Sequence, residues 1–327
     1  MIEGKLTSEL MNKLVLNKTG ADRPEVLLPP GLGEDSTALD LACEACLLAT
    51  DPITAAEEGM GELAVHISCN DIAACGAEPV GILLTVLLSP EDSPEKLERI
   101  MEEVHQAAKA LNVSILGGHT EVTSAVRRTV LSVTAVGKCQ KERIVRSSGA
   151  RPGQQVLLSK KLALEGTAIL AAELAEKLRA VLTEEQLQRA RDYIKQISIV
   201  PEALAAAELG ASAMHDITEG GVLGALWELA WASQVGLEIW TEKIPLLEET
   251  RIITEFLGID PLGLIASGSL IIVGDPKLEL EKKLTEKGFQ VAQIGVVKER
   301  SEGLNLITPC GTKPLQPPRR DHLYDAF

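Results

Sequence analysis

The sequence predicts a mixed α/β (α+β) protein of two domains. Three observations lead to this prediction: a length of 327 residues, apolar segments of strand and helix type that alternate along the chain, and a polar, basic stretch near the middle. At roughly 150 residues per domain, this length suits two domains. Apolar residues make up 45% of the chain, which rules out wholesale disorder. Periodicity alone does not separate α/β from α+β.

A shift in composition marks the expected domain boundary. Over residues 139–153, Lys, Arg, Ser, Gly and Pro replace the apolar pattern that precedes this stretch. We therefore place the boundary near residue 147, with a first domain over residues 1–147 and a second over residues 148–327. The chain shows no internal repeat of about 20–50 residues and no sustained heptads, which excludes a solenoid and a coiled coil.

Local patterns predict the elements of the first domain. Apolar residues that recur every three or four positions indicate helices, and unbroken or β-branched apolar runs indicate strands. Pro94 suits the first turn of a helix that follows Ser93 and ends at Asn112. The expected order is helix 7–16, strands 37–41 and 46–50, helix 59–76, strand 79–88, helix 93–112, and strands 113–116 and 129–136.

The second domain again mixes both types of element. Thr183 and Gln186 fit a capping box, and the apolar Leu182 and Leu187 flank it as a hydrophobic staple. The tail from Pro309 onward is rich in Pro, which predicts a loop. The patterns predict strands over 156–159 and 269–273, and helices over 166–181, 221–230 and 276–287.

The charge balance excludes several classes of partner. With 32 basic and 47 acidic residues, the formal net charge is −15 and the sequence pI is about 4.9. Duplex nucleic acid is bound by Lys and Arg that neutralise phosphates, so we expect no nucleic-acid partner. The same charge argues against an anionic membrane surface. Aromatic residues make up only 2%, too few for the stacking platforms that hold single-stranded nucleic acid.

No targeting segment is visible, and we therefore expect a cytoplasmic protein. The N-terminal residues 1–5 lack the apolar core of a signal peptide. No apolar run approaches the length of about 18 residues that a membrane-spanning helix needs. Six cysteines in 327 residues are too few for a disulfide framework.

Four acidic residues suggest a site for Mg²⁺ and a nucleotide. Asp35, Asp51, Asp71 and Glu121 each lie in or beside a segment or strand end that contains Gly, Thr or Asn. Mg²⁺ takes one or two carboxylates together with phosphate oxygens, and an acidic protein can hold a polyphosphate through such an ion. Glycine lets backbone N–H groups approach phosphate closely, and the glycines beside these acids are Gly31, Gly33, Gly117 and Gly118.

The alternative is that these residues form four ordinary turns, because Gly, Asp and Asn fill turns in any protein. The sequence contains no P-loop and no Gly-x-Gly-x-x-Gly fingerprint after a strand, so a phosphate site here is of another type. The co-occurrence of four acids at element junctions within one half of the chain favours the functional interpretation.

In their order along the chain, the motifs resemble those of the AIR (aminoimidazole ribonucleotide) synthase superfamily. This group includes the hydrogenase maturation factor HypE, thiamine-monophosphate kinase and selenophosphate synthetase. The Asn-Asp block with its Gly-Ala-x-Pro end is most similar to that of the HypE branch. The matching segments span nearly the whole chain and are Gly31–Leu39, Thr50–Asp51, Asn70–Pro79, Gly117–Val122 and Asp216–Gly221.

The resemblance implies a fold and a site. It implies an N-terminal domain whose sheet forms a barrel across a homodimer, and a C-terminal α/β domain. ATP and Mg²⁺ would lie against the N-terminal domain, and the γ-phosphoryl group would pass to an oxygen of the acceptor. Asp35, Asp51 and Asp71 match metal-ligand positions. In addition to Asp35 and Asp51, the residues that match the nucleotide region are Gly31, Gly33, Ser36, Asn70, Gly117, Gly118 and Thr120.

Three departures separate this chain from HypE. HypE carries a C-terminal cysteine that receives a carbamoyl group, whereas the last cysteine here is Cys310. His119 stands where HypE usually has an acid, so we expect Glu121 to take over that task. Glu219 stands where HypE usually has Arg. These differences suggest a HypE-like paralogue, with Asp71, Glu121 and His119 as its candidate catalytic residues.

Three functions stay open on the sequence. The first is Mg²⁺-ATP-dependent phosphorylation of an oxygen on an amide or carbonyl acceptor, which is either a small molecule or a protein carboxamide. The second is a small-molecule kinase of the thiamine-monophosphate type. The third is a homodimeric ATP-binding scaffold without turnover, which His119 and the missing tail cysteine motivate.

Overall fold

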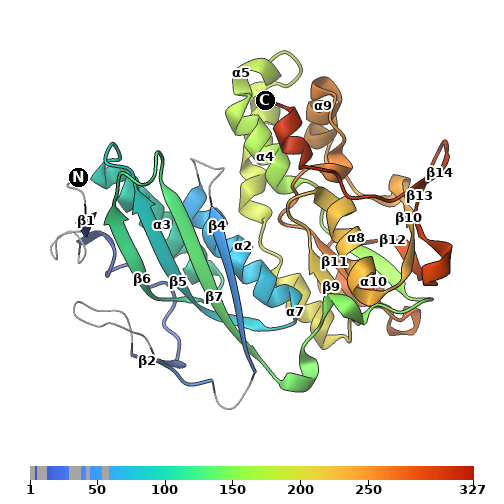
Figure 1. Cartoon of the computed structure of the whole chain (residues 1–327), viewed down its shortest axis with the longest axis horizontal. Coiled ribbons are helices and arrows are strands. Elements are labelled where there is room, and N and C mark those ends of the chain that lie inside the picture. Colours follow the sequence, from blue (N-terminus) through green and yellow to red (C-terminus); the bar gives the residue numbers. More distant parts are fainter. Residues whose placement is uncertain (1–3, 6–12, 29–37, 42–44, 54–58) are drawn as a thin grey trace. The chain divides into compact units, whose positions relative to one another are not determined.

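The computed structural model describes residues 4–5, 13–28, 38–41, 45–53 and 59–327. Within it the chain forms two compact units (Figure 1). Unit 1 comprises residues 1–73 and 77–142, and unit 2 comprises residues 74–76 and 143–327. Each unit combines helices with sheets, which confirms the predicted mixed α/β class.

Unit 1 is built on a five-stranded sheet with the order β1-β6-β5-β7-β4. Only β5 and β6 run parallel, and the other neighbours are antiparallel. A separate pair, β2 and β3, forms a second small sheet. The elements are β1 (Gly4–Lys5), β2 (Val26–Leu28), β3 (Ala38–Leu39), β4 (Ala45–Ile53), α2 (Met60–Ala74), β5 (Glu78–Leu88), α3 (Pro94–Ala110), β6 (Ser114–Val122) and β7 (Val130–Cys139).

The two long helices α2 and α3 cover one face of this sheet. Ser68 of α2 donates a hydrogen bond to the carbonyl of Val133 in β7 (3.4 Å), and Ile72 lies against Gly137 of the same strand. The start of α2 also touches α3, where the Gly61 N–H donates to Glu103 (3.0 Å). Apolar side chains of α3 recur with helical spacing and are buried, as the amphipathic pattern predicts.

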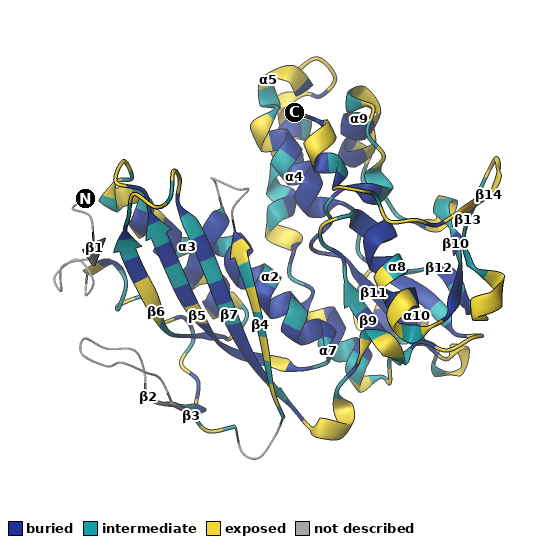
Figure 2. Ribbon diagram, in the orientation of Figure 1, coloured by how far each residue is buried: buried dark blue, intermediate teal, exposed yellow. Residues whose placement is uncertain are grey.

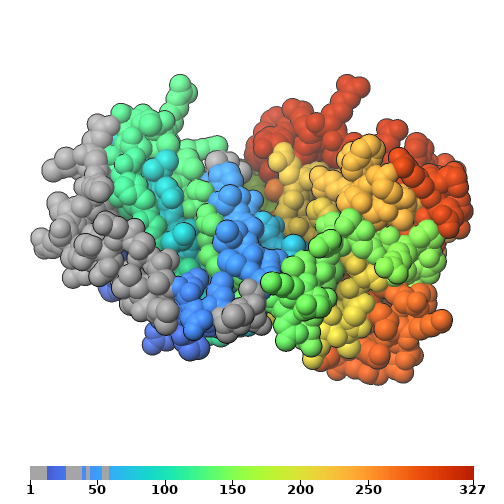
Figure 3. Space-filling model, turned by 60° about the horizontal axis from the view of Figure 1, so that its bottom comes forward, coloured from blue at the N-terminus to red at the C-terminus, as the bar shows by residue number. Residues whose placement is uncertain are grey.

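No described helix of unit 1 covers the opposite face of the sheet (Figure 2). On the edge strand β4, residues alternate between half-buried and exposed, and Leu48 is 68% exposed. Leu83 of β5 is 37% exposed on the same face. Between these leucines the Thr134 hydroxyl donates to the Thr50 hydroxyl (3.0 Å). In Figure 3 the blue atoms of β4 form part of the surface of unit 1.

Gly118 adopts a strand conformation that only glycine tolerates. Its φ of +146° lies outside the range of L side chains, and a Cβ there would stand 1.8 Å from the carbonyl oxygen of Leu84 in β5. The β5–β6 ladder shifts register just before this point, between Ile82 and Leu83. The Gly117-Gly118 pair therefore has a structural role, because it lets β6 pass β5 at a bulge.

Unit 2 is built on a seven-stranded sheet with the order β14-β13-β10-β12-β8-β11-β9. Its neighbours are antiparallel except for the parallel pair β10 and β13. Its strands are β8 (Gln155–Ser159), β9 (Ala213–Asp216), β10 (Gly236–Trp240), β11 (Leu270–Gly274), β12 (Val291–Lys298), β13 (Leu304–Thr308) and β14 (Gly311–Pro314).

Helices α4, α5, α6, α8 and α9 pack with this sheet around an apolar core of mainly Leu, Ile, Val and Ala, whereas α7 and α10 contact each other and contribute no residue to this core. Thr183 and Gln186 form the predicted capping box at the start of α6. The helices are α4 (Leu164–Glu173), α5 (Ala175–Leu178), α6 (Glu184–Asp192), α7 (Val200–Glu208), α8 (Gly221–Ser233), α9 (Glu248–Leu257) and α10 (Leu280–Glu286).

Four predicted segments differ from the structure, and one of them is the helix expected over 276–287, which divides at Glu279 into a 3₁₀ turn (Pro276–Leu278) and α10. The strand expected at 113–116 continues through the glycines, because β6 runs to Val122. The helix expected over 166–181 divides at Leu174 into α4 and α5. The tail from Pro309 contains the strand β14 rather than loop alone. Residues 7–12 of the predicted first helix lie outside the described residues.

Among the described residues, no helix is both long and apolar enough to cross a membrane.

We expect Gly118→Ala to destabilise unit 1 by at least about 3 kcal/mol, since the new Cβ meets backbone atoms that cannot swing aside. Gly59→Ala is the matched control, because Gly59 also has positive φ (+67°) but no described atom within 4 Å of its Cβ position. Urea unfolding of both variants measures the difference. Equal losses for the two variants would show that the close approach of β6 to β5 is not required.

Candidate nucleotide and metal site

Asp51 lies in a row of residues that crosses the whole sheet of unit 1. Asp51 pairs with Val133, Val133 pairs with Leu84, and Leu84 pairs with Gly118. Residues in one row of a sheet direct their side chains to the same face. Val133 and Leu84 are buried, and Ser68 of α2 bonds to Val133. Asp51 therefore points to the face that α2 covers.

Helix α2 brings Asn70 and Asp71 to that same face. Nearly every residue of α2 is buried, and Asn70 is only 2% exposed. Asp71 and Ile67, one turn apart, lie on the less buried stripe of the helix. Helix α2 thus supplies an amide and a carboxylate on the face of the sheet where Asp51 lies.

The carboxylate of Asp51 is the strongest indication of a cation site. Its Oδ2 atom is buried and has no hydrogen-bond partner among the described residues. A buried carboxylate oxygen without a hydrogen-bond partner is unfavourable, and a metal ion would satisfy it. Asp51 on β4 and Asp71 on α2 thus suit Mg²⁺, which prefers oxygen ligands.

The third predicted metal ligand cannot be placed. Asp35 lies outside the described residues, as do Gly31, Gly33 and Ser36. Within the described ranges, no three His, Cys, Asp or Glu side chains come together as a metal site. A complete set of three aspartates would therefore need Asp35 to join Asp51 and Asp71.

His119 and Glu121 lie on the other face of the sheet. His119 pairs with Thr85, and Glu121 pairs with Leu87. Both residues stand an odd number of positions from Gly118, which lies in the row of Asp51, so their side chains point to the opposite face. The His119 ring lies 3.2 Å from the Glu121 carboxylate, and both side chains are partly exposed. The structure therefore separates His119 and Glu121 from Asp51. Thr120, which is 4% exposed, lies on the face that α2 covers, as Asp51 does.

The glycine-acid segment at 31–36 is held at both ends. Strand β2 precedes it and β3 follows it, and the two pair through Val26 with Leu39 and Leu28 with Ala38. Residues 29–37 connect β2 to β3 in the sequence and lie outside the described residues, so the structure places only the two strands that flank the predicted nucleotide segment.

A buried ionic cluster ties β2 to the main sheet. The Glu25 carboxylate accepts two bonds from Arg23 (2.8 and 3.0 Å) and one from Lys138 of β7. Arg23 also donates to Glu78 of β5 (2.8 Å) and to the carbonyl of Asn112 (3.1 Å). The sequence analysis did not find this cluster. Its signal was an Arg and a Glu two positions apart, just ahead of the glycine segment.

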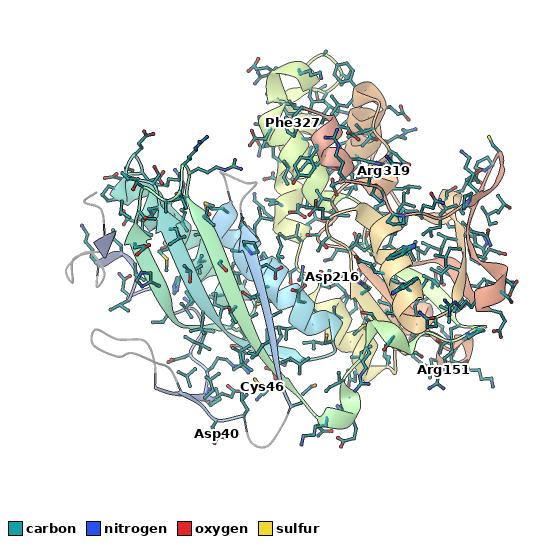
Figure 4. The ribbon with its side chains drawn as sticks, in the orientation of Figure 1. Asp40, Cys46, Arg151, Asp216, Arg319 and Phe327 are labelled. Carbon is teal, nitrogen blue, oxygen red and sulfur yellow. The ribbon has the colours of Figure 1, made fainter. Side chains whose placement is uncertain are left out.

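In unit 2 the Asp216–Gly221 motif forms the turn between β9 and α8, and Figure 4 labels Asp216 there. The neighbouring His215 contacts the Glu228 carboxylate through Nε2 (3.3 Å), and its Nδ1 lies 2.7 Å from the Asp216 carbonyl. A half-open cavity of about 250 Å³ lies at the other end of α8, around Trp227 and Trp231. No predicted site residue lines that cavity.

Two family models match the chain. The AIR synthase related protein, N-terminal domain, matches residues 33–139. The AIR synthase related protein, C-terminal domain, matches residues 151–305. The chain belongs to the AIR synthase-related family. The resemblance inferred from the motifs is confirmed, and this family member carries both domains in the family order.

Relatives of this AIR synthase-related chain share most of its length. Carbamoyl dehydratase HypE of Azotobacter vinelandii is 28% identical over 322 residues, which cover 94% of this chain and 89% of the relative. The crystal structure of HypE in complex with ATP has a TM-score of 0.82 at 24% identity, covering 96% of this chain and 95% of that one. The structure of thiamine-monophosphate kinase from Stenotrophomonas maltophilia has a TM-score of 0.75 at 19% identity, covering 94% and 97%. These structures confirm the predicted AIR synthase-like fold.

We expect the ionic cluster at Glu25 to make the fold sensitive to acid. Hydrogen bonds from Arg23 and Lys138 hold the pKa of Glu25 at about 2, below its usual 4.5, against the opposing effect of burial. A lowered carboxyl pKa gives stability that is present above about pH 4.5 and is lost as the pH falls toward about 2. The loss is on the order of 3 kcal/mol.

Urea unfolding between pH 7 and pH 2.5 measures this effect. Glu25→Gln should be less stable than the wild type at pH 7, with the difference shrinking through that window. Glu98→Gln is the control, because Glu98 is exposed on α3. Parallel curves for the wild type and Glu25→Gln would rule out the assigned role of the Glu25 carboxylate.

Proposed function

We propose that this chain is an ATP-dependent enzyme that, with Mg²⁺, transfers the γ-phosphoryl group of ATP to an oxygen of an amide or carbonyl acceptor. The observation that carries the proposal is the buried, unpartnered Oδ2 of Asp51, which faces α2 with its Asn70-Asp71 pair. The family membership and the ATP complex of HypE support the nucleotide.

In this proposal Asp35, Asp51 and Asp71 hold Mg²⁺. The bound ion would neutralise charge on the phosphate oxygens. Asn70 and Thr120, both buried on the same face, contact the nucleotide, and Gly31, Gly33 and Ser36 supply the loop that β2 and β3 close. The acceptor oxygen attacks the γ-phosphorus as the bond to the ADP oxygen breaks, so catalysis is mainly positioning and charge stabilisation.

The relatives support a proposed class of acceptor. A relative that matches most of this chain is a carbamoyl dehydratase, and loss of water from a carboxamide is eased when its oxygen is first phosphorylated. We therefore propose a carboxamide on a small molecule or a protein. His119 and Glu121 lie on the other face of the sheet, so they are given no role at the proposed ATP site.

The likeness to thiamine-monophosphate kinase supports a second candidate, a small-molecule kinase. A direct assay distinguishes this kinase from the carboxamide-directed enzyme. The kinase converts thiamine monophosphate with release of ADP, whereas the carboxamide-directed enzyme does not. A protein that binds MgATP tightly but releases no ADP with thiamine monophosphate or with a panel of carboxamides would favour the scaffold alternative.

We further propose that the chain is a homodimer that pairs through the uncovered face of unit 1. This face carries the exposed Leu48 and Leu83 beside the bonded pair Thr50 and Thr134. A sheet with apolar side chains on a face that no described helix covers is a typical interaction surface. A barrel formed across two copies, as the family resemblance implies, would bury it.

We expect Asp51→Asn and Asp71→Asn each to weaken MgATP binding by at least about 10-fold, which is about 1.4 kcal/mol, because a metal ligand loses its charge. Isothermal calorimetry with MgATP measures the affinity. Glu98→Gln on α3 is the control and should bind as the wild type does. Wild-type affinity in both Asp variants would rule out the assigned metal ligands.

We expect Leu48→Glu to weaken the dimer by at least about 100-fold, since it removes apolar burial and places two like charges close to each other across a symmetric contact. Sedimentation equilibrium gives the dissociation constant. Val181→Glu provides the matched control, because Val181 is an exposed apolar residue of unit 2. An unchanged dimer for Leu48→Glu would assign the interface to another surface.

A further inference from the structure

The last residues of the chain are built into unit 2. Leu315, Leu323 and Ala326 belong to its apolar core, and each is at most 9% exposed. Between these anchors the chain forms a short 3₁₀ helix, η8 (His322–Asp325). In Figure 4 the labels of Arg319 and Phe327 mark this part of unit 2. We refer to residues 315–327 as the C-terminal strap.

One carboxylate of the strap accepts hydrogen bonds from three separate segments. Oδ2 of Asp321 accepts the N–H of Gly220 at the start of α8 (2.7 Å). Oδ1 accepts the N–H of Ile265 (3.2 Å) and that of Leu323 within the strap (2.7 Å). Asp321 is 1% exposed, so these bonds are shielded from water. A carboxylate with several backbone donors forms strong, charge-assisted bonds.

The segments that Asp321 joins also interlock sterically. A Cβ on Gly221 would stand 2.4 Å from the carbonyl oxygen of Leu262, and a Cβ on Gly263 would stand 2.5 Å from the His322 ring. The Ala266 N–H donates to the Thr218 carbonyl (3.3 Å). The turn between β9 and α8, the segment 262–266 and the strap therefore form one joint, with Asp321 at its centre.

We propose that Asp321 is a positioning residue that fixes the Asp216–Gly221 turn. Gly220 and Gly221 both adopt positive φ (+83° and +61°), so the turn has no rigid conformation of its own. The N–H of Gly220 is an orphan donor at the start of α8, and the strap satisfies it from about 100 positions further along the chain. The docked strap thus sets the shape of a motif that the family resemblance singles out.

The geometry demands a carboxylate at position 321. Both oxygens are used, and each faces an N–H donor: Gly220 on one side, Ile265 and Leu323 on the other. An asparagine has a single acceptor oxygen, so its NH₂ group would face one of these N–H donors and could not accept a hydrogen bond from it. The Asp321→Asn variant therefore keeps the size of the side chain and breaks one arm of the joint.

Hydrogen–deuterium exchange of the full chain tests the joint. The amides of Gly220 and Ile265 should be protected in the wild type. Asp321→Asn should raise exchange in residues 216–221 and 262–266 by at least about 10-fold, with unit 1 unchanged. Asp325→Asn is the control, because Asp325 is exposed and pairs only with Arg320 of the strap among the described residues. Unprotected Gly220 and Ile265 amides in the wild type, or unchanged exchange in folded Asp321→Asn, would overturn the proposal.

A kinetic comparison tests the link to turnover, which rests on the proposed function. With MgATP and a carboxamide acceptor that the wild type turns over, Asp321→Asn should lower kcat for ADP release by at least about 10-fold and leave the KM for ATP within about 2-fold, since the proposed nucleotide residues lie in unit 1. Equal kcat for the wild type and Asp321→Asn would overturn the link. If the wild type releases no ADP with any carboxamide of the panel, the proposed function fails, whereas the exchange experiment still decides the role of Asp321.

Discussion

The lateral register of the sheet in unit 1 is the constraint on which the candidate site depends. Four strands keep Asp51, Val133, Leu84 and Gly118 in one row, and this row decides which side chains face α2. The register survives the bulge in β6 only because Gly118 has no Cβ to meet the backbone of β5. A shift of one residue in β4 would turn Asp51 away from α2 and bring Thr50 in its place.

The role of each carboxylate in this region follows from how it is buried and paired. Two described acids of unit 1, Glu25 and the half-buried Asp51, differ in how their buried oxygens are satisfied. Glu25 is matched by Arg23 and Lys138, and this pairing stabilises the fold. Asp51 has a buried oxygen that no described residue satisfies. The first arrangement needs no ligand, whereas the second leaves a cost that a cation would remove, which is why Asp51 carries the functional proposal.

The sequence predicted the structural features that depend on residues close together in the chain. The capping box at Thr183, the helix start at Ser93-Pro94 and the buried strand β5 follow from local patterns. The motifs also identified the family. The sequence grouped Glu121 with Asp51, whereas the structure places the two on opposite faces, because facing depends on pairing between strands that lie far apart in the chain. The glycines were assigned to phosphate approach, and at Gly118 a steric need of the sheet is sufficient to explain the residue.

The two loops that carry family motifs obtain their support from remote carboxylates. Glu25 fixes β2 ahead of residues 29–37 through Lys138, more than a hundred positions away, and Asp321 fixes the Asp216–Gly221 turn across a similar separation. Glycine-rich loops gain freedom to approach a ligand but lose a preferred shape, so an outside group must supply that shape. A charged acceptor that is shielded from water suits this task, because each bond is strong and directional. In this chain, therefore, we expect each motif to function only together with its distant carboxylate, so that loss of Glu25 or Asp321 weakens binding or slows turnover while the motif itself is kept.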